Sequence, residues 1–454
     1  MRRVAVVGGG LAGITAALQL ADAGCAVVLL EGRPKLGGLT HSFERDGRWI
    51  DNGQHVFLRC CTSYLRLLDR LGVRDQVHLQ RRLDVPVRSG RRRGVGRIRR
   101  NELPAPLHLG PALASYRWLS LVERVAAASG ALAMGRVDRT APETDLQSFG
   151  NWLAAHGQDA RAVEALWELI GIATLNARAD EASLAVAATV FQVGLLEQSD
   201  AADIGWSLVP LQQLHGDAAA RALAAAGVAV RVRARVRALN EQDGGWCIES
   251  GRYDDVVLAV PPTEAARLLP EGALDLRAGW AEALGSSPIV NAHVVFDRKV
   301  LDEPFVAGVD SPLQWVFDRT VQCGERAGGE QYVAVSLSAA DELIDSPVAD
   351  LRDLLVPALR RLLPAAADAR VKEFFVTRER HATFRPAPGS GRLRPAATTS
   401  RPGLHLAGAW TATGWPATME SAARSGEAAA ASVLRHALTT RPARLVLGSE
   451  DVVL

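Results

Sequence analysis

The sequence lacks a long hydrophobic run, contains few cysteines and has almost no net charge, and each of these absences excludes a class of protein. No apolar stretch reaches the roughly 20 residues of a membrane-spanning helix. The five cysteines show no metal-ligand spacing, so we expect reduced thiols, a cytoplasmic protein and no metal site. A net charge of +2 argues against a dedicated nucleic-acid-binding protein.

The chain begins with the pattern of a dinucleotide-binding turn. The apolar run Arg3–Val7 is typical of a buried parallel strand, and it leads directly into the motif G-x-G-x-x-G. Gly8 permits the tight turn, and Gly10 lets the backbone approach a pyrophosphate. Gly13 lets the following helix pack closely against the strand.

The residues after the glycines complete this pattern. Helical spacing of apolar residues predicts a helix over Ile14–Ala23, whose N-terminal amides would face the pyrophosphate. A second predicted strand, Ala26–Leu30, ends at Glu31, where a carboxylate can accept hydrogen bonds from ribose hydroxyls. A glycine-rich turn in an unrelated domain is the alternative, but the ordered strand, glycines, helix, strand and acid favour a dinucleotide site.

A second glycine pair, Gly37–Gly38, follows soon after Glu31. Glycines at these two positions would let the backbone pass close to an extended cofactor. This arrangement resembles the amine oxidase and phytoene desaturase superfamily of flavoproteins. The resemblance implies FAD as the cofactor, bound by an α/β, Rossmann-like domain beside an α+β substrate-binding domain. Family members usually carry an arginine after the second glycine pair, where this chain has Leu39.

Two later segments complete the cofactor site in this resemblance. Residues 228–262 contain predicted strands over Val228–Val236, Trp246–Ser250 and Tyr253–Val260, and the backbone at Val236 would meet the adenine. Taken alone, these residues also fit an ordinary antiparallel meander.

The last segment begins with a predicted strand, Gly403–Gly408, and continues through a loop into a helix that opens near Ala417 and extends to about Leu434. The N-terminus of that helix would stabilise negative charge on the isoalloxazine. Many family members carry an acid where Ala409 stands.

At 454 residues the chain exceeds the usual size of one hydrophobic core, so we expect two domains. We assign 1–60, 205–262 and 395–437 to the FAD-binding domain, 61–204 and 263–394 to the substrate-binding domain, and 438–454 to a loose tail. The residues expected to contact FAD are Gly8, Gly10, Leu11, Ala12, Gly13, Glu31, Gly32, Arg33, Gly37, Gly38, Leu39, Gly53, Gln54, His55, Val236, Gly408, Ala409, Trp415, Pro416, Ala417 and Thr418.

Two motifs narrow the resemblance to the hydroxysqualene dehydroxylase family. They are Asp51–His55 and Gly414–Glu420, and shorter matches occur at Leu175–Asn176, Ala182–Ser183, Pro288–Asn291 and Ala382–Phe384. The resemblance implies a reductive reaction in squalene and hopanoid biosynthesis, in which an allylic C30 alcohol loses its hydroxyl and receives hydride from reduced flavin. The electron donor is not evident from the sequence.

Loss of the hydroxyl needs an acid or a hydrogen-bond donor, and His55 and Glu420 are the two candidates. His55 could instead bond flavin or backbone, and Glu420 could simply be a favourable carboxylate at a helix N-terminus. His293 and His381 fit structural roles better.

An arginine-rich run precedes an apolar stretch and indicates a membrane-facing surface. Arg81–Arg100 holds nine arginines, and residues 103–134 follow with many leucines and valines. Such a surface could rest on anionic lipid at the inner membrane face and receive a hydrocarbon. The alternative is a core helix pair beside a solvated loop, and with 49 arginines against three lysines the whole chain favours arginine.

Three other functions remain open. A carotenoid or polyene desaturase would use the same flavin fold in the oxidative direction. A hydrophilic amine oxidase is disfavoured by an aromatic content of 5%, because its tunnel would carry aromatic walls. A scaffold that has lost its cofactor would be consistent with Leu39 and Ala409.

Overall fold

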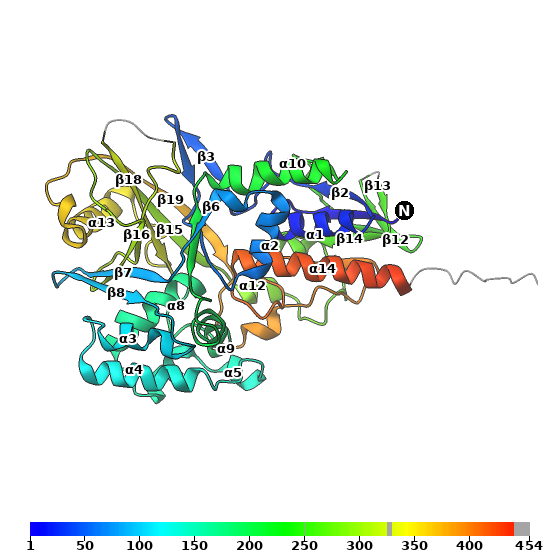
Figure 1. The fold of residues 1–454 in the computed structure, drawn as a ribbon. Helices are drawn as coiled ribbons and strands as arrows, with labels where there is room; N and C mark the ends of the chain where they lie inside the picture. Colours follow the sequence, from blue (N-terminus) through cyan, green and yellow to red (C-terminus); the bar gives the residue numbers. More distant parts are fainter. Residues whose placement is uncertain (250, 325–328, 440–454) are drawn as a thin grey trace, which may run out of the picture.

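The computed structural model describes residues 1–249, 251–324 and 329–439. Its first sheet is parallel throughout, with the strand order β10-β2-β1-β14-β20 (Figure 1). The strands are β1 (Arg3–Val7), β2 (Ala26–Leu30), β10 (Ala229–Arg231), β14 (Asp255–Leu258) and β20 (Leu404–Leu406). Three distant stretches of the chain therefore build one Rossmann-like sheet, as the sequence predicts.

Four helices share one hydrophobic core with this sheet. They are α1 (Leu11–Asp22), α2 (Thr62–Leu71), α10 (Ala218–Ala225) and α14 (Met419–Thr439). Helix α14 lies directly against α1, and a Cβ on Gly426 would come within 2.3 Å of the Ala12 carbonyl oxygen. The absent side chain at Gly426 thus lets the C-terminal helix pack on the first helix of the dinucleotide fold.

Smaller elements pack against the parallel sheet through a separate core. Apolar residues of β1 and β14 contact an antiparallel meander and two short helices. These elements are β11 (Asn240–Gln242), β12 (Gly245–Ile248), β13 (Gly251–Tyr253), α11 (Pro262–Leu268) and α12 (Trp280–Leu284).

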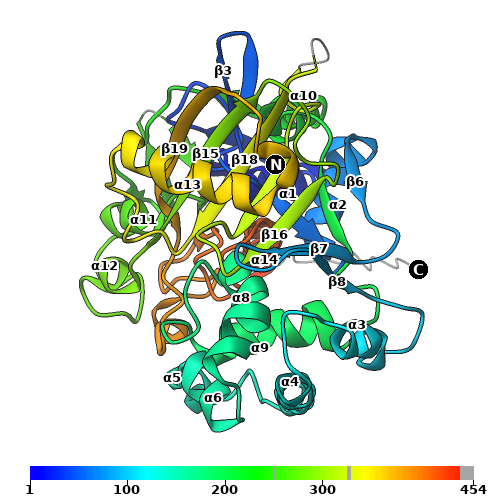
Figure 2. The ribbon, with the colours of Figure 1, turned by 90° about the vertical axis from the view of Figure 1, so that its left-hand side faces the viewer.

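The second large sheet has the order β19-β15-β18-β17-β16-β7-β8. Helix α13 (Val348–Leu362) packs on it and buries a core of valines and leucines (Figure 2). The strands are β7 (Asp84–Ser89), β8 (Val95–Arg99), β15 (Ser287–Phe296), β16 (Phe305–Val309), β17 (Trp315–Asp318), β18 (Gln331–Ser338) and β19 (Val371–Thr383).

A group of helices lies below this sheet in Figure 2 and shares a third core with it. The helices are α3 (Gly110–Ala114), α4 (Leu121–Met134), α5 (Pro142–Leu146), α6 (Phe149–Ala155), α7 (Ala160–Ala162), α8 (Glu168–Leu175) and α9 (Leu184–Phe191). The fold is therefore an α/β dinucleotide domain with an α+β partner, although the exact boundaries we assign to the two domains stay predictions.

Short strands lie between these two parts of the molecule. A hairpin pairs β3 (Ser42–Arg45) with β4 (Arg48–Asp51), and a small sheet has the order β5-β9-β6. Its strands are β5 (Val56–Leu58), β6 (Val77–Leu79) and β9 (Ile204–Ser207). Strand β4 leads directly into the predicted Asp51–His55 motif.

Several predicted elements differ in length from those observed. The strand predicted over Val228–Val236 covers only Ala229–Arg231, because the chain turns at Arg233, which has a φ of 57°. The strand predicted over Tyr253–Val260 is divided between the end of β13 and β14. Residue 250 and the tail beyond 439 lie outside the described residues.

Within the described parts of the chain, no helix is both long enough and apolar enough to span a membrane.

Candidate cofactor and active site

The first glycine turn has the geometry that the fingerprint predicts. Gly8 has a φ of +110°, and a Cβ there would lie 2.2 Å from the Ala259 carbonyl oxygen. A Cβ on Gly13 would lie 1.9 Å from the Gly8 carbonyl oxygen, so helix α1 can approach β1 only with glycine at this position. Leu11 and Ala12 form the buried first residues of α1.

Gly10 is different, because no protein atom requires glycine there. Its φ is −78°, and a Cβ would meet nothing closer than the Gly38 Cα at 3.8 Å. The second glycine pair lies alongside, with the Gly37 amide donating to the Gly9 carbonyl at 2.9 Å. The two glycine-rich loops therefore leave an open cradle at the N-terminus of α1, where an anionic pyrophosphate is favoured.

Glu31 lies at the end of β2, beside the cradle. Its carboxylate accepts hydrogen bonds from the Gly9 and Arg33 amides, both at 2.6 Å. The chain after β10 runs alongside, because the Ala234 amide donates to the Glu31 carbonyl at 2.8 Å. This contact brings the segment that contains Val236 close to Gly32, and the contact of Val236 with the adenine stays a prediction.

The residues after β4 contain buried polar atoms that lack partners within the described chain. Gln54 Nε2 and Asn291 Oδ1 are both buried and neither has a hydrogen bond there. Gly53 is close to both His55 and Asn291, since a Cβ on it would lie 3.3 Å from His55 Cε1 and 3.6 Å from Asn291 Nδ2. An unpaired donor and an unpaired acceptor fit the edge of an isoalloxazine, which presents both kinds of group. Leu39 keeps 39% of its surface exposed, so it offers apolar rather than charged contact.

Asp51 anchors this segment. Its buried carboxylate accepts hydrogen bonds from Ser42 Oγ at 2.6 Å and from the Leu211 amide at 3.0 Å. It also forms a buried ion pair with Arg319, which follows β17 of the second sheet. The ion pair therefore ties the start of the Asp51–His55 motif to the second sheet, and sequence reasoning did not identify Arg319.

His55 has one ring nitrogen engaged with the protein. Its Nδ1 lies 3.1 Å from the Gly53 carbonyl oxygen, which can only accept, so the neutral ring carries its proton on Nδ1. Nε2 is then the nitrogen available to a ligand. Burial lowers the pKa of His55 below its ordinary value, so the neutral form dominates at pH 7.

Glu420 lies in the first turn of α14, as predicted, but its side chain faces α2. The fully buried carboxylate accepts hydrogen bonds from the Ser63 and Tyr64 amides at 3.2 and 2.8 Å and from Arg424 Nε at 2.6 Å. It therefore satisfies the N-terminus of α2 while paired with an arginine. These contacts favour a structural role, and the catalytic role stays a prediction.

The C-terminal loop reaches the helix through a series of small residues. The Gly408 amide donates to Ser425 Oγ at 2.8 Å, and Ser421 Oγ donates to the Ala409 carbonyl at 3.0 Å. Thr418 Oγ1 accepts from the Ser421 amide at 3.2 Å and so caps α14. The residues between the loop and this cap are Trp415, Pro416 and Ala417.

Two other buried histidines have protein partners. His293 in β15 contacts the Tyr332 hydroxyl and Thr377 Oγ1, which agrees with the structural role predicted for it. His215 lies in η5 (Gln212–Asp217), and its Nε2 is 2.8 Å from the Tyr64 hydroxyl. Burial lowers the pKa of each histidine to about 3, so both stay neutral at physiological pH.

Three potential metal ligands meet where helix α14 lies beside strands β14 and β20. Ligand atoms of Asp255, His405 and His436 lie within 4.8 Å of one another. Arg2 donates to both oxygens of the Asp255 carboxylate. A guanidinium in this place repels a metal cation, so the contacts favour an ion-pair cluster.

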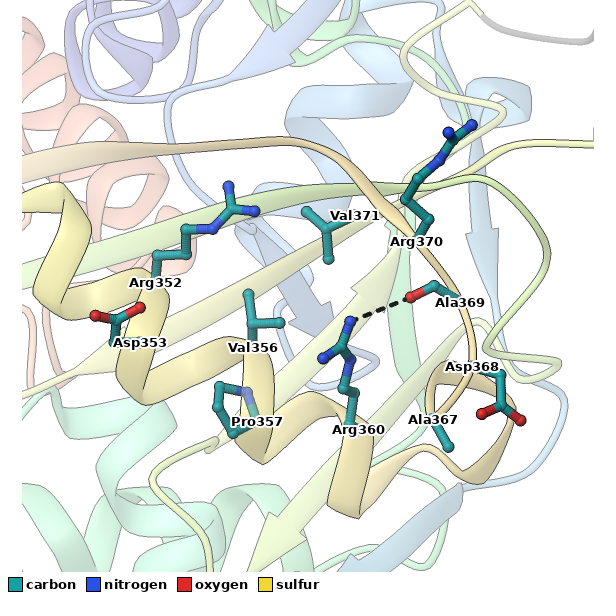
Figure 3. Close-up of a pocket in the computed structure, with 10 residues that line it drawn as sticks. All are labelled: Arg352, Asp353, Val356, Pro357, Arg360, Ala367, Asp368, Ala369, Arg370 and Val371. Carbon is teal, nitrogen blue, oxygen red and sulfur yellow. Dashed lines mark hydrogen bonds between the residues drawn. The ribbon is translucent and has the colours of Figure 1, made fainter.

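A surface groove of about 780 Å³ lies on α13 and the chain before β19 (Figure 3). Arg352, Arg360 and Arg370 line it with valine and alanine side chains. None of the residues predicted to bind cofactor or substrate borders this groove, so it does not belong to the candidate site.

Comparison with known proteins agrees with this geometry. The chain is 28% identical to a hydroxysqualene dehydroxylase of Sinorhizobium fredii, covering 94% of this chain and 97% of that protein. It is 25% identical to a zeta-carotene desaturase of Synechocystis, covering 95% and 97%. The fold matches that of putrescine oxidase bound to putrescine, with a TM-score of 0.72, 20% identity and coverage of 96% and 99%.

A family model described as flavin containing amine oxidoreductase matches residues 11–434, a range that includes the second glycine pair and most of the closing helix. The chain therefore belongs to the flavin-containing amine oxidoreductase family and is an FAD-dependent oxidoreductase.

Proposed function

We propose that this protein reduces hydroxysqualene to squalene by reductive dehydroxylation. The relatives named as hydroxysqualene dehydroxylases support this reaction, but desaturases of zeta-carotene and phytoene are similarly close. The observation that carries the proposal is His55, whose Nδ1 is held by the Gly53 carbonyl while Nε2 is available to a ligand. A pure hydrocarbon offers this nitrogen no partner, whereas an allylic alcohol can hydrogen-bond to it.

The chain's own residues have defined tasks in this reaction. FAD, held by the two glycine loops and the loop before α14, supplies hydride when reduced. His55 Nε2 binds the substrate hydroxyl and, in its protonated form, donates a proton to it. Asp51 and Arg319 hold the segment that carries His55.

An anaerobic assay with hydroxysqualene and prereduced enzyme tests the proposal directly. We expect one squalene for each reduced flavin, because one hydride replaces the hydroxyl on carbon and one further proton lets the hydroxyl leave as water. A second assay, with phytoene and oxidised enzyme, tests the desaturase reaction. Formation of a more unsaturated polyene, without squalene in the first reaction, would establish the desaturase instead.

We further propose that the substrate is taken from an anionic membrane surface. Six large apolar residues on and near α3 and α4 are exposed, and Leu121 and Val122 keep 73% and 79% of their surfaces in solvent. The complete set is Leu103, Leu107, Leu121, Val122, Val125 and Leu132. The neighbouring Trp118 and Leu119 are buried, so only part of the predicted apolar stretch can meet lipid.

Much of the arginine run is neutralised by the fold. Arg82, Arg88, Arg97, Arg99 and Arg100 form ion pairs with nearby acids. Arg91–Arg93 are exposed in the turn before β8 and have no ion pair within the described residues. Gly94 in that turn lies against the side chain of Arg117, so these charges border the apolar patch.

Co-sedimentation with vesicles should therefore require anionic lipid and weaken with salt, because exposed charges are screened beyond about 10 Å at 0.1 M. Val122→Asp should weaken vesicle binding at least about tenfold, because a valine side chain that becomes buried in lipid contributes about 1.5–3 kcal/mol. Val321→Asp is a matched control at an exposed valine outside the patch. Equal pelleting with neutral vesicles in high salt would contradict the electrostatic part, and equal loss in both variants would contradict the docking face.

A further inference from the structure

Arg394 is a buried cation in the loop that leads to β20. Its side chain is only 8% exposed, and within the described residues it forms no ion pair with a carboxylate. The guanidinium instead donates to the Thr411 carbonyl at 2.7 Å and to the Trp415 carbonyl at 2.8 Å. Weaker contacts reach the carbonyls of Ala409 and Trp410.

The surroundings of Arg394 keep its guanidinium protonated but place no carboxylate in direct contact with it. Its Cζ lies 4.5 Å from the centre of the Phe384 ring, which stabilises a cation through its π face. Burial lowers the pKa of Arg394 to about 10, so the group stays protonated at neutral pH. Residues 408–418 contain no acidic side chain, and the charge of Asp145 raises the pKa of Arg394 without forming an ion pair with it.

A buried charge without a carboxylate in direct contact is costly, because carbonyl dipoles replace only part of the lost hydration. Such a cost is expected where a negative charge arrives with a ligand. Loop 408–418, which Arg394 holds, leads into the N-terminus of α14, the helix end predicted to face the isoalloxazine. Two-electron reduction of a flavin takes up two electrons and one proton at neutral pH, which leaves one additional negative charge on the ring.

We propose that Arg394 is a positioning residue whose buried charge favours the reduced flavin over the oxidised flavin. The guanidinium acts through the loop: it draws four carbonyl oxygens toward itself and adds a positive potential on the cofactor side. The inference goes beyond the proposed function, since it rests on FAD binding and does not depend on the substrate.

The flavin midpoint potential, measured with dithionite and reference dyes on holoenzyme, tests this role. Arg394→Gln should lower the preference for reduced over oxidised FAD at least about tenfold, which equals about 30 mV for a two-electron couple. Arg394→Lys should stay within about threefold of the parent, because the charge is kept although the fork of hydrogen bonds is lost. Arg392→Gln, at an exposed arginine nearby, should leave the potential unchanged.

A purely structural Arg394 would give a different pattern. The apoproteins of both Arg394 variants would then melt at a lower temperature. In addition, either the midpoint potential of Arg394→Gln would equal that of the parent, or Arg394→Lys would lower the potential as much as Arg394→Gln does. Either result overturns the proposal. If Arg394→Gln retains no FAD, Ala409→Asp decides the question. A carboxylate close to an intact Arg394 should lower the potential by the same tenfold factor, and an unchanged potential would refute the inference.

Discussion

Replacement of Gly10 by valine should abolish FAD binding and leave the protein folded. A Cβ at Gly10 would meet no protein atom closer than 3.8 Å, but the valine side chain would fill the cradle between the two glycine loops. Loss of two charge-assisted hydrogen bonds to a pyrophosphate, at about 1.5–3 kcal/mol each, weakens binding by about 10²–10⁴-fold. Titration of the apoprotein with FAD, followed by flavin absorbance and by circular dichroism, measures binding and folding separately.

Two other glycines provide the controls. Gly110→Val places the same side chain at an open position at the start of α3, where nothing lies within 4 Å, and should leave FAD affinity unchanged. Gly13→Ala should instead destabilise the fold, because its Cβ would collide with the Gly8 carbonyl. Full cofactor occupancy in Gly10→Val would show that this turn is not the pyrophosphate site.

Replacement of His55 by alanine should lower the rate of hydroxysqualene reduction by about 10²–10⁴-fold, the usual contribution of a general acid. Hydroxide is a poor leaving group, and His55 Nε2 is the ring nitrogen that the protein leaves available. Affinity for the C30 chain should change little, since hydrocarbon burial supplies most of it. Single-turnover kinetics with prereduced enzyme isolate this step from reoxidation by an unknown donor.

The pH profile gives an independent measure of the same role. Burial places the pKa of His55 below its ordinary value of about 6.5. The acid form therefore accumulates only as the pH falls, so the single-turnover rate should rise below pH 6.5 and level off below the pKa in the folded enzyme. This rise should disappear in His55→Ala.

Glu420→Gln is the matched comparison, because Glu420 was the other candidate acid. The variant keeps the size of the side chain but weakens the acceptors for the Ser63 and Tyr64 amides and the pair with Arg424. We expect a lower free energy of unfolding and a rate close to that of the parent. Parental rates in both variants would exclude both acids and leave ordered water or spontaneous ionisation of the substrate.

Local patterns in the sequence were sufficient for the dinucleotide fold. Strand β1, the glycine turn, α1 and β2 all fall close to their predicted bounds, because each depends on residues within a few positions of one another. Predictions were weaker where a turn interrupts an apolar run. The strand after Val228 ends early, because Arg233 adopts a positive φ that residue types alone do not reveal.

Side-chain direction also lay beyond the sequence. Glu420 was correctly placed in the first turn of the closing helix, but only the packing of α14 against α2 decides that its carboxylate meets backbone amides there. The arginine run shows the same limit. Its charge is evident in the sequence, yet acids such as Asp203 and Glu303, far along the chain, neutralise part of it.

The sequence alone determined the glycine turn and the strand–helix–strand unit of the dinucleotide fold, because short-range sterics and periodicity control these features. FAD as the cofactor followed from the resemblance to a flavoprotein family. Tertiary structure alone decided which polar groups are paired and which remain available. Asp51 pairs with Arg319, and Arg394 donates to carbonyls of loop 408–418, through contacts between different segments of the chain. Burial and counter-charge depend on such contacts, so the electrostatics of the site emerge only when the chain is folded.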